Sequence, residues 1–427
     1  MNSGASPAHP QAIVAPTTVD ATLLPPAMAD AWQAMGKILP EGRMAGGCVR
    51  DLLLGRAVHD LDIAVPLPPE VVMARAAKGE MRTVPTGLDH GTVTVLVTTA
   101  SGTVPVEVTT LRRDVETDGR HAVVAWTDDW REDAARRDFT INALYADYEG
   151  QVSDYFGGLE DLRAGRVRFV GVAKTRIQED ALRMMRFFRF TARYGQQVDQ
   201  EGLEVIRELA PLASTLSAER VAAELLRLLA GPERNLQTIL EHMVSTGILD
   251  SWLGQQRPQA VPGTLGGALN KALEVPGLGA HESGPTLLRL AAFAPDGQAG
   301  AQLKLSRKAQ NFLQALQVPL PQAQSTAVVR PALAERGLAA VVGRAVLEQW
   351  PLVALEALAV EPVPTFTLTG RDGLAHGLAA GPELGQALKA CRQWWLNHDC
   401  QPSMEACRAW LAEQAGAGRF STFSTMA

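Results

Sequence analysis

The 427-residue chain is poor in cysteine and in aromatic side chains. Its four cysteines form no Cys-x-x-Cys pair, so neither a zinc site nor a disulfide framework is indicated, and reduced thiols in a cytoplasmic protein are expected. No run of about 18 apolar residues is present, which predicts no membrane span. Residues 1–21 lack the basic start and apolar core of a secretory signal, and their Ala, Pro, Ser and Thr content predicts a disordered tail.

The remaining composition is that of an ordinary globular protein, with 46% hydrophobic and 20% charged residues and length enough for two or more domains. A net charge of −6 argues mildly against a nucleic-acid partner, but the charge is unevenly distributed. Between Arg163 and Arg193, nine Lys or Arg face only Glu179 and Asp180, a local charge of +7 that leaves −13 elsewhere. This basic strip indicates a polyanion site, and a solvated helix face is the alternative.

The most informative stretch lies between Gly46 and Asp62. Gly46-Gly47 precedes a helix-like run, where backbone N–H groups can approach a phosphate at the positive end of the helix dipole. Asp60 and Asp62 enter an apolar strand one residue apart, so both carboxylates project to the same side. Carboxylate oxygens suit Mg²⁺, which predicts a phosphate cradle and a metal pair one helix apart. Taken alone, a Gly-Gly pair is more often a simple turn, and a lone Asp-x-Asp is more often a solvated strand end or turn.

Helices are predicted at 22–40 and 69–78, and strands at 92–97 and 104–110 with a hairpin at Gly102. Together they indicate a mixed α/β head.

Two features near these strands allow more than one interpretation. Glu107, within the second strand, is either a third acid beside Asp60 and Asp62 or a solvent-facing residue. Residues 112–138 are highly charged with few apolar positions, which predicts a long polar loop. Such a loop in a compact domain is usually functional or disordered.

An arginine-rich run occupies 136–143. Asp138 or Thr140 is suited to cap a helix there. Arg137 has the planar fork that pairs with phosphate oxygens or a ribose, and a surface salt bridge is the alternative.

Residues 174–194 have apolar positions at helical spacing, which predicts one amphipathic helix. Asp180 and Arg183 are three residues apart and should be neighbours on one face, whereas Arg189 is rotated away from Asp180. Cytosine and adenine both present an amino donor beside a ring-nitrogen acceptor, which an Asp–Arg pair complements. Guanine and uracil would leave buried groups unpaired, at roughly 1–3 kcal/mol each. The alternative is an intrahelical salt-bridge ladder that contributes little.

These segments resemble the class II nucleotidyltransferases, the family of bacterial tRNA CCA-adding enzymes and poly(A) polymerases. The resemblance covers about 46–231, and its motifs are 46–62, Arg-Arg-Asp-Phe-Thr-Ile-Asn-Ala at 136–143, the link at 154–162, Glu-Asp-x-x-Arg-x-x-Arg at 179–186 and 217–224. The last motif is interpreted as scaffold, with Arg220 and Glu224 as an i, i+4 pair.

The resemblance implies an α+β fold, in which a polymerase-β-like nucleotidyltransferase head is followed by an all-α neck, body and tail. The expected divisions are a disordered tail at 1–21, a catalytic head at 22–160, a nucleotide-selecting and RNA-binding neck at 161–235, and a tRNA-binding body and tail at 236–427. The implied reaction adds CCA from CTP and ATP to the 3′ end of tRNA and releases pyrophosphate. The tRNA acceptor arm is the expected partner, and no protein partner or membrane is indicated.

The resemblance also implies a role for each candidate residue. Asp60 and Asp62 are the catalytic acids that bind Mg²⁺, and Glu107 is a candidate third acid. The nucleotide-binding residues are Gly46, Gly47, Arg50, Arg137, Asp180, Arg183, Arg186 and Arg189.

Other members of the family stay open as alternatives. His59 precedes Asp60 where poly(A) polymerases of the family typically have lysine, and 401–427 contains only Arg408 and Arg419 as basic residues, which favours tRNA. In the family the polar loop is linked to the final nucleotide, which argues against an enzyme that adds CC only. An A-adding enzyme or a poly(A) polymerase is the alternative. A catalytically silent RNA-binding protein and a small-molecule nucleotidyltransferase are disfavoured, because the acids and the neck motif are intact.

Overall fold

The computed structural model describes residues 18–117, 122–231, 235–253, 284–321, 326–417 and 419–420. The chain forms two compact units that divide between Ser251 and Trp252. This division falls inside the segment at 236–427 that the sequence assigns to body and tail. Each unit has its own buried apolar cluster.

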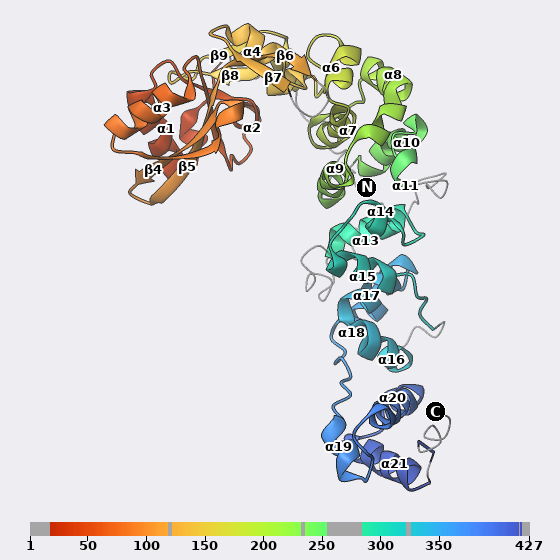
Figure 1. The fold of residues 1–427 in the computed structure, drawn as a ribbon. Helices are drawn as coiled ribbons and strands as arrows, with labels where there is room; N and C mark the ends of the chain where they lie inside the picture. The colour runs from red at the N-terminus through yellow and green to blue at the C-terminus, as the bar shows by residue number, and fades with distance from the viewer. Residues whose placement is uncertain are drawn as a thin grey trace, which may run out of the picture. The chain divides into compact units, whose positions relative to one another are not determined.

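A seven-stranded sheet organises the first half of the first unit, in the order β3-β4-β5-β2-β1-β8-β9 (Figure 1). Strands β2 and β5 pair in parallel and the other neighbours antiparallel. The strands are β1 (Arg43–Ala45), β2 (Leu61–Val65), β3 (Arg82–Gly87), β4 (Thr92–Thr99), β5 (Gly102–Thr110), β8 (Leu144–Ala146) and β9 (Val152–Asp154). The helices of this region are α1 (Pro26–Ile38), α2 (Gly47–Leu53) and α3 (Pro69–Lys78).

The predicted elements between 22 and 110 are confirmed, including the hairpin at Gly102. Alternation explains β4, because Val93, Val95 and Val97 are fully buried, whereas Leu96 and Thr98 on the opposite face are more exposed. Helices α1 and α3 pack against β4 and β5. The mixed sheet followed by helices confirms the predicted α+β class.

The disordered tail predicted at 1–21 is wrong for its last residues, which are ordered in the structure. Residues 1–17 lie outside the described residues. Thr18 forms an antiparallel bridge with Gln151, and the Val19 amide donates to the Gly150 carbonyl at 2.8 Å. Val19 is also buried, so the residues that end the predicted tail are anchored by a backbone hydrogen bond and an apolar contact.

The polar loop predicted at 112–138 is wrong over much of its length. The structure has a two-stranded antiparallel sheet of β6 (Arg112–Thr117) and β7 (Ala122–Trp126), followed by α4 (Trp130–Ala135). The run Ala-Val-Val-Ala-Trp has high β propensity, which the surrounding charges concealed. Asp129 caps α4 by accepting from the Arg131 amide at 2.7 Å.

The second half of the first unit is helical, as predicted. Its elements are η3 (Thr140–Asn142), α5 (Gly158–Arg163), α6 (Ala173–Glu179), α7 (Leu182–Tyr194), α8 (Gln200–Leu209), η4 (Ala210–Thr215), α9 (Ala218–Ala230), α10 (Leu236–Thr246) and α11 (Asp250–Leu253).

The single helix predicted at 174–194 is broken at Asp180. Asp180 is extended, with φ −151°, and its carboxylate accepts from the Leu182 amide at 3.1 Å. A side chain that satisfies a backbone donor this way ends one helix and starts the next.

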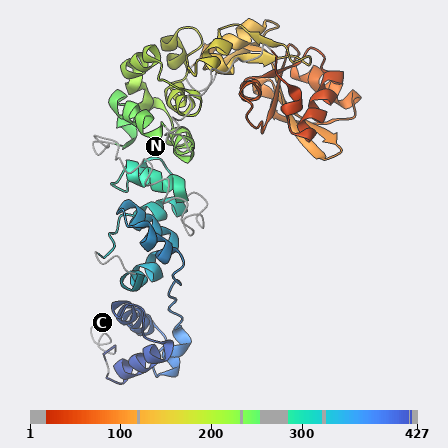
Figure 2. The same cartoon turned by 180° about the vertical axis from the view of Figure 1, so that it is seen from behind.

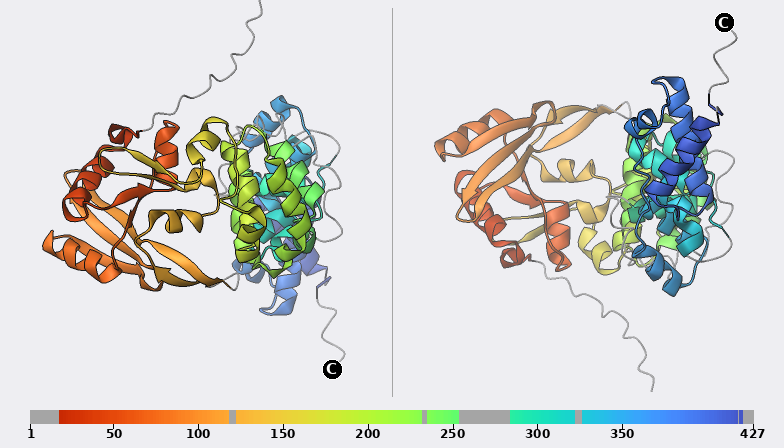
Figure 3. Two further views of the ribbon diagram at one scale, coloured as in Figure 1. Left: turned by 90° about the horizontal axis from the view of Figure 1, so that it is seen from above. Right: turned by 90° about the horizontal axis from the view of Figure 1, so that it is seen from below.

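All the regular secondary structure in the described part of the second unit is helical (Figures 2 and 3). Its helices are α13 (Gly284–Phe293), α14 (Ala299–Gln302), α15 (Arg307–Ala315), α16 (Thr326–Arg336), α17 (Leu338–Leu347), α18 (Leu352–Ala359), α19 (Gly370–Ala375), α20 (Pro382–Asn397) and α21 (Met404–Gly416). Cys391, Cys400 and Cys407 are buried in the apolar cluster of its last helices. Within the described residues, no helix combines the length and apolar content needed to cross a membrane.

Candidate active site

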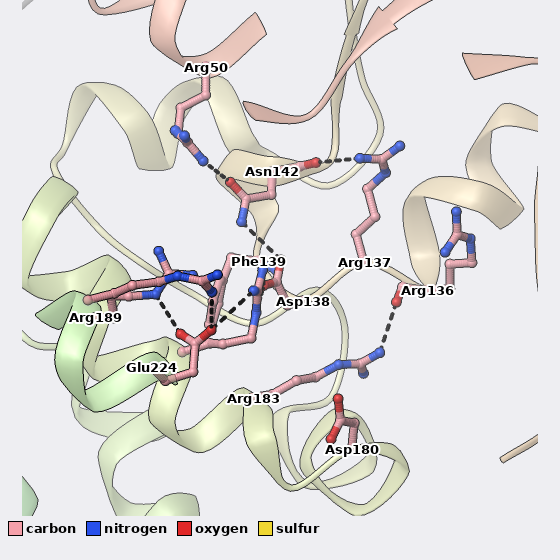
Figure 4. A network of polar contacts seen from close by, with 12 residues as sticks. Arg50, Arg136, Arg137, Asp138, Phe139, Asn142, Asp180, Arg183, Arg189 and Glu224 are labelled. Carbon is pink, nitrogen blue, oxygen red and sulfur yellow. Dashed lines mark hydrogen bonds and ion pairs between the residues drawn. The ribbon is translucent and has the colours of Figure 1, made fainter. Parts of the chain in front are cut away.

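A cleft of about 660 Å³ in the first unit collects nearly all of the predicted site residues. It is lined from the sheet region by Gly46, Gly47, Arg50, Asp60, Asp62, Arg137, Asp138 and Asn142, and from α7 and the turn that precedes it by Asp180, Arg183, Arg186, Arg189 and Phe190. Glu107 is the one predicted residue that does not line it. Figure 4 shows how most of these side chains converge.

Gly46 sits where a side chain would displace an arginine. It has φ +69°, and a Cβ built on it would lie 2.7 Å from Arg137 Nη1. Arg137 is fixed in this place by the Tyr145 hydroxyl, the Asn142 carbonyl and the Asp133 carboxylate, at 3.1, 3.2 and 3.3 Å. Glycine is therefore required for the guanidinium to lie over the start of α2. Because α2 has only seven residues, guanidinium groups supply more positive charge here than the helix dipole does.

Arg50 enters the cleft from α2 as a rigid, nearly buried cation. Its guanidinium pairs with Asp51 through two contacts of 3.0 Å and donates to Asn142 Oδ1. It also lies 4.1 Å from the ring centre of Tyr194. A planar fork held on several sides loses little freedom when it meets a phosphate.

Asp60 directly precedes β2 and Asp62 is its second residue, and both line the cleft. Asp62 is paired in register with Glu107 of β5, so the third candidate acid is its direct neighbour across the parallel strands. The pKa of Asp62 is raised to about 6, first by burial and then by the charges of Glu107 and Asp60, against which Arg137 acts.

This acidic arrangement has the chemistry of a divalent-cation site, although it is incomplete as a metal cage. Among the described residues, no group of three or more His, Cys, Asp or Glu is arranged to hold a metal ion. Two carboxylates whose charges repel each other would bind a divalent cation favourably, because the cation relieves that repulsion. Mg²⁺ usually keeps several waters, so further ligands would come from water or from the phosphates of a bound substrate.

Asp138 and Asn142 are cleft residues that the sequence analysis did not single out for the site. Asp138 Oδ2 accepts from Arg186 Nε and Nη2 at 2.8 and 2.6 Å, and its Oδ1 accepts from Asn142 Nδ2 at 3.0 Å. Burial alone would raise the pKa of Asp138, but Arg186 and the hydrogen bonds hold it below its ordinary value. The predicted capping of a helix by Asp138 is wrong, since η3 has no side-chain cap. Asp138 instead ties the sheet region to α7.

Asp180 and Arg183 both line the cleft but do not share the helix face that was predicted. Arg183 donates to the Glu179 carboxylate at 2.8 Å and to the Arg176 carbonyl at 3.0 Å. It also donates to the Arg136 carbonyl at 3.0 Å (Figure 4). Asp180 is outside α7 and accepts from Arg220 Nη2 at 2.8 Å. The Asp180 acceptor is therefore held by Arg220 of α9, whereas the Arg183 donor is held by the end of α6.

The Arg220–Glu224 pair predicted within the motif at 217–224 is wrong. Arg220 pairs with Asp180, whereas Glu224 accepts from Arg189 Nε at 2.5 Å. Glu224 is 3% exposed, so it is a buried carboxylate that orients a cleft arginine. The i, i+4 spacing suggested a pair within α9, but Glu224 contacts α7 and Arg220 contacts the turn before α7.

The cleft thus combines an acidic pair, several oriented guanidinium groups and a separate Asp–Arg donor–acceptor set. Phosphate groups fit the guanidinium side, cations fit the acidic pair, and a base edge fits Asp180 with Arg183. The arrangement can hold a nucleoside triphosphate beside a divalent cation.

Comparisons of the sequence and of the structure with known proteins agree on one family. Residues 42–168 match the poly(A) polymerase head domain, and residues 195–259 match the probable RNA- and SrmB-binding site of polymerase A. The mitochondrial CCA tRNA nucleotidyltransferase 1 of Danio rerio is 46% identical over 195 residues, 45% of this chain and 44% of the relative. Its Homo sapiens counterpart is 45% identical over 202 residues, 46% and 45% of the two chains. The match thus spans less than half the length of these curated relatives.

Among solved structures, the CCA-adding enzyme of Bacillus stearothermophilus in complex with CTP superposes with a TM-score of 0.70. It is 30% identical, and the match covers 93% of this chain and 100% of that one.

Proposed function

The chain belongs to the family of CCA-adding enzymes and poly(A) polymerases, and we propose that it completes the 3′ end of tRNA by adding CCA from CTP and ATP, with release of pyrophosphate. The observation that carries this proposal is the single cleft that joins Asp60 and Asp62 with Asp180 and Arg183. An acidic pair for a cation and a donor–acceptor pair for a base are both needed by an enzyme that selects nucleotides without a template.

In the proposed reaction, Asp60 and Asp62 hold Mg²⁺, and Glu107 contributes negative charge beside Asp62. When bound, the cation lowers the pKa of the attacking 3′-hydroxyl and neutralises the triphosphate. Arg50 and Arg137 orient the phosphates, since both are fixed by several partners and need little rearrangement. Most of the rate enhancement then comes from positioning and from charges placed before the reaction begins.

Base selection in this proposal depends on Asp180 and Arg183. The Asp180 carboxylate retains acceptor capacity beside its bond to Arg220, and Arg183 uses three of its N–H groups in the contacts described above. The remaining acceptor and donors match the amino group and the ring nitrogen of cytosine or adenine. Arg186 and Arg189 lie beside this pair and are assigned to the ribose, the phosphates or the primer end.

The proposed compartment is the cytoplasm. The free, buried cysteines suit a reducing environment. Mitochondrial relatives are also known.

The test uses tRNA transcripts that end before CCA, before CA or before A, with Mg²⁺ and labelled CTP and ATP. The proposal predicts completion to CCA on all three substrates and no extension of a tRNA that already carries CCA. Extension of only the third substrate would identify an A-adding enzyme, and long A tails on unrelated RNA would identify a poly(A) polymerase. No incorporation by the wild-type protein would contradict all three activities. Asp60→Ala, with the exposed Asp89→Ala as its matched control, links any activity to the cleft.

A further inference from the structure

A second, basic pocket of about 570 Å³ adjoins the candidate active site. Four arginines line it, with Arg56 after α2, Arg189 and Arg193 on α7, and Arg227 on α9. Leu228, Ala230 and Gly231 complete its wall. Arg189 lines both this pocket and the cleft, so the two spaces share a side chain.

The charges around the basic pocket are not balanced. Glu224 accepts from Arg189 at 2.5 Å and lies 3.3 Å from Arg227. Among the described residues, neither Arg56 nor Arg193 forms an ion pair with a carboxylate. Four guanidinium groups therefore face one carboxylate, which leaves three positive charges in a small space. Such an excess persists only where it serves an anion or is well solvated.

Arg56 and Arg193 are held in place without being neutralised. The Arg56 guanidinium donates to the Arg193 carbonyl at 3.2 and 3.3 Å and lies 4.8 Å from the ring centre of Tyr194. The Arg193 guanidinium lies 5.5 Å from the same ring. Contacts to a carbonyl and to an aromatic face orient a guanidinium but leave its full charge. Burial and the positive charges of Arg186 and Arg227 lower the pKa of Arg189, although Glu224 acts against them.

We propose that the basic pocket binds a backbone phosphate of the RNA primer just upstream of its reactive 3′ end. This inference rests on the proposed function. The triphosphate is already served by Arg50 and Arg137 beside the acidic pair, so an anion in the second pocket belongs to the other substrate. The shared Arg189 places the pocket one side chain away from the cleft, as expected for consecutive residues of one strand. The apolar wall formed by Leu228 and Ala230 gives a ribose or base a surface to contact.

The test compares wild type with the double variant Arg56→Gln/Arg193→Gln in the full-length protein. Both residues are exposed, and the proposed nucleotide site does not use them. Binding of fluorescent tRNA lacking its last nucleotide is measured by polarisation, without nucleotide, at several salt concentrations. The expected result is roughly tenfold weaker binding and a salt dependence reduced by about one counterion for each phosphate that the variant no longer binds. The KM values for CTP and ATP stay unchanged.

Matched variants distinguish this pocket from a general effect of positive charge. Arg82→Gln removes an equally exposed charge on β3 and should leave tRNA binding unchanged. The double variant Arg56→Lys/Arg193→Lys should retain most of the affinity, and Arg193→Gln alone serves if the double variant unfolds. Pyrophosphate inhibition is measured in parallel, because the leaving group offers the same phosphate chemistry. Weaker inhibition with unchanged tRNA affinity would assign the pocket to pyrophosphate and overturn the proposal.

Unchanged tRNA affinity in the glutamine variants would also overturn it. Polarisation reports binding without catalysis. If the protein binds tRNA through this pocket but adds no nucleotide, the proposed function is contradicted and the phosphate-binding role of the pocket is not.

Discussion

Asp62 is the residue where stability and the proposed catalysis conflict most clearly. Its carboxylate is partly buried beside Glu107 and Asp60, and its pKa of about 6 lies above the ordinary value of 3.8. The folded state therefore binds a proton at Asp62 more tightly than the unfolded state does. The charged form destabilises the fold above pH 6, and this penalty disappears as the pH falls towards 4.

We accordingly predict that Asp62→Asn abolishes nucleotide addition and stabilises the protein in EDTA. At pH 8 the gain should be about 1–3 kcal/mol, and it should vanish near pH 4. Thermal denaturation across this pH range measures it. The exposed Asp89→Asn is the matched control and should leave the melting temperature unchanged. A destabilised Asp62→Asn protein at pH 8 would contradict this electrostatic explanation.

At the scale of elements, α9 holds the cleft side of α7 in place. Glu224 of α9 is buried and faces Arg189, Arg186 and Arg227, with the first contact the shortest. Arg220, one turn earlier, holds Asp180. A helix assigned to scaffold from its sequence thus orients two proposed nucleotide-binding residues.

Removing the Glu224 charge should lower the stability of the fold. Glu224→Gln leaves Arg189 without its buried partner, and we predict a loss of about 3 kcal/mol in the free energy of unfolding. Urea denaturation measures this, and Glu204→Gln on the exposed face of α8 is the control. A loss no larger than that of the control would mean that water satisfies Arg189.

Local patterns could predict elements and motif residues, but not the contacts between distant elements. Strand alternation located β4 and β5, and motif spacing identified cleft residues such as Asp60 and Arg183. The Arg220–Asp180 and Arg189–Glu224 contacts join residues 40 and 35 positions apart, and no local period encodes them. The β6–β7 hairpin was missed because its charged residues outweighed a short β-branched run. The break at Asp180 was missed because helical spacing continues through it.

For the whole molecule, two compact units with separate cores should unfold separately. We predict two calorimetric transitions. ATP with Mg²⁺ should raise only the transition of the first unit, because the proposed nucleotide residues lie entirely within it. At 100 times its Kd, a ligand adds about 2.7 kcal/mol to the unit that binds it.

Glu224→Gln assigns the transitions, since it should lower the same transition that ATP raises. A single transition, or an equal shift of both by ATP, would contradict independent units.

We propose that Asp180 and Arg183 together read the base without a template. This claim is tested most directly by giving tRNA that ends before CCA all four nucleoside triphosphates at equal concentration and sequencing the product ends. Wild type should yield CCA. Asp180→Ala should incorporate G or U at least about tenfold more often relative to C and A, because the groups that reject those bases are removed. Glu204→Ala should resemble wild type. An active Asp180→Ala enzyme that still yields only CCA would contradict the claim.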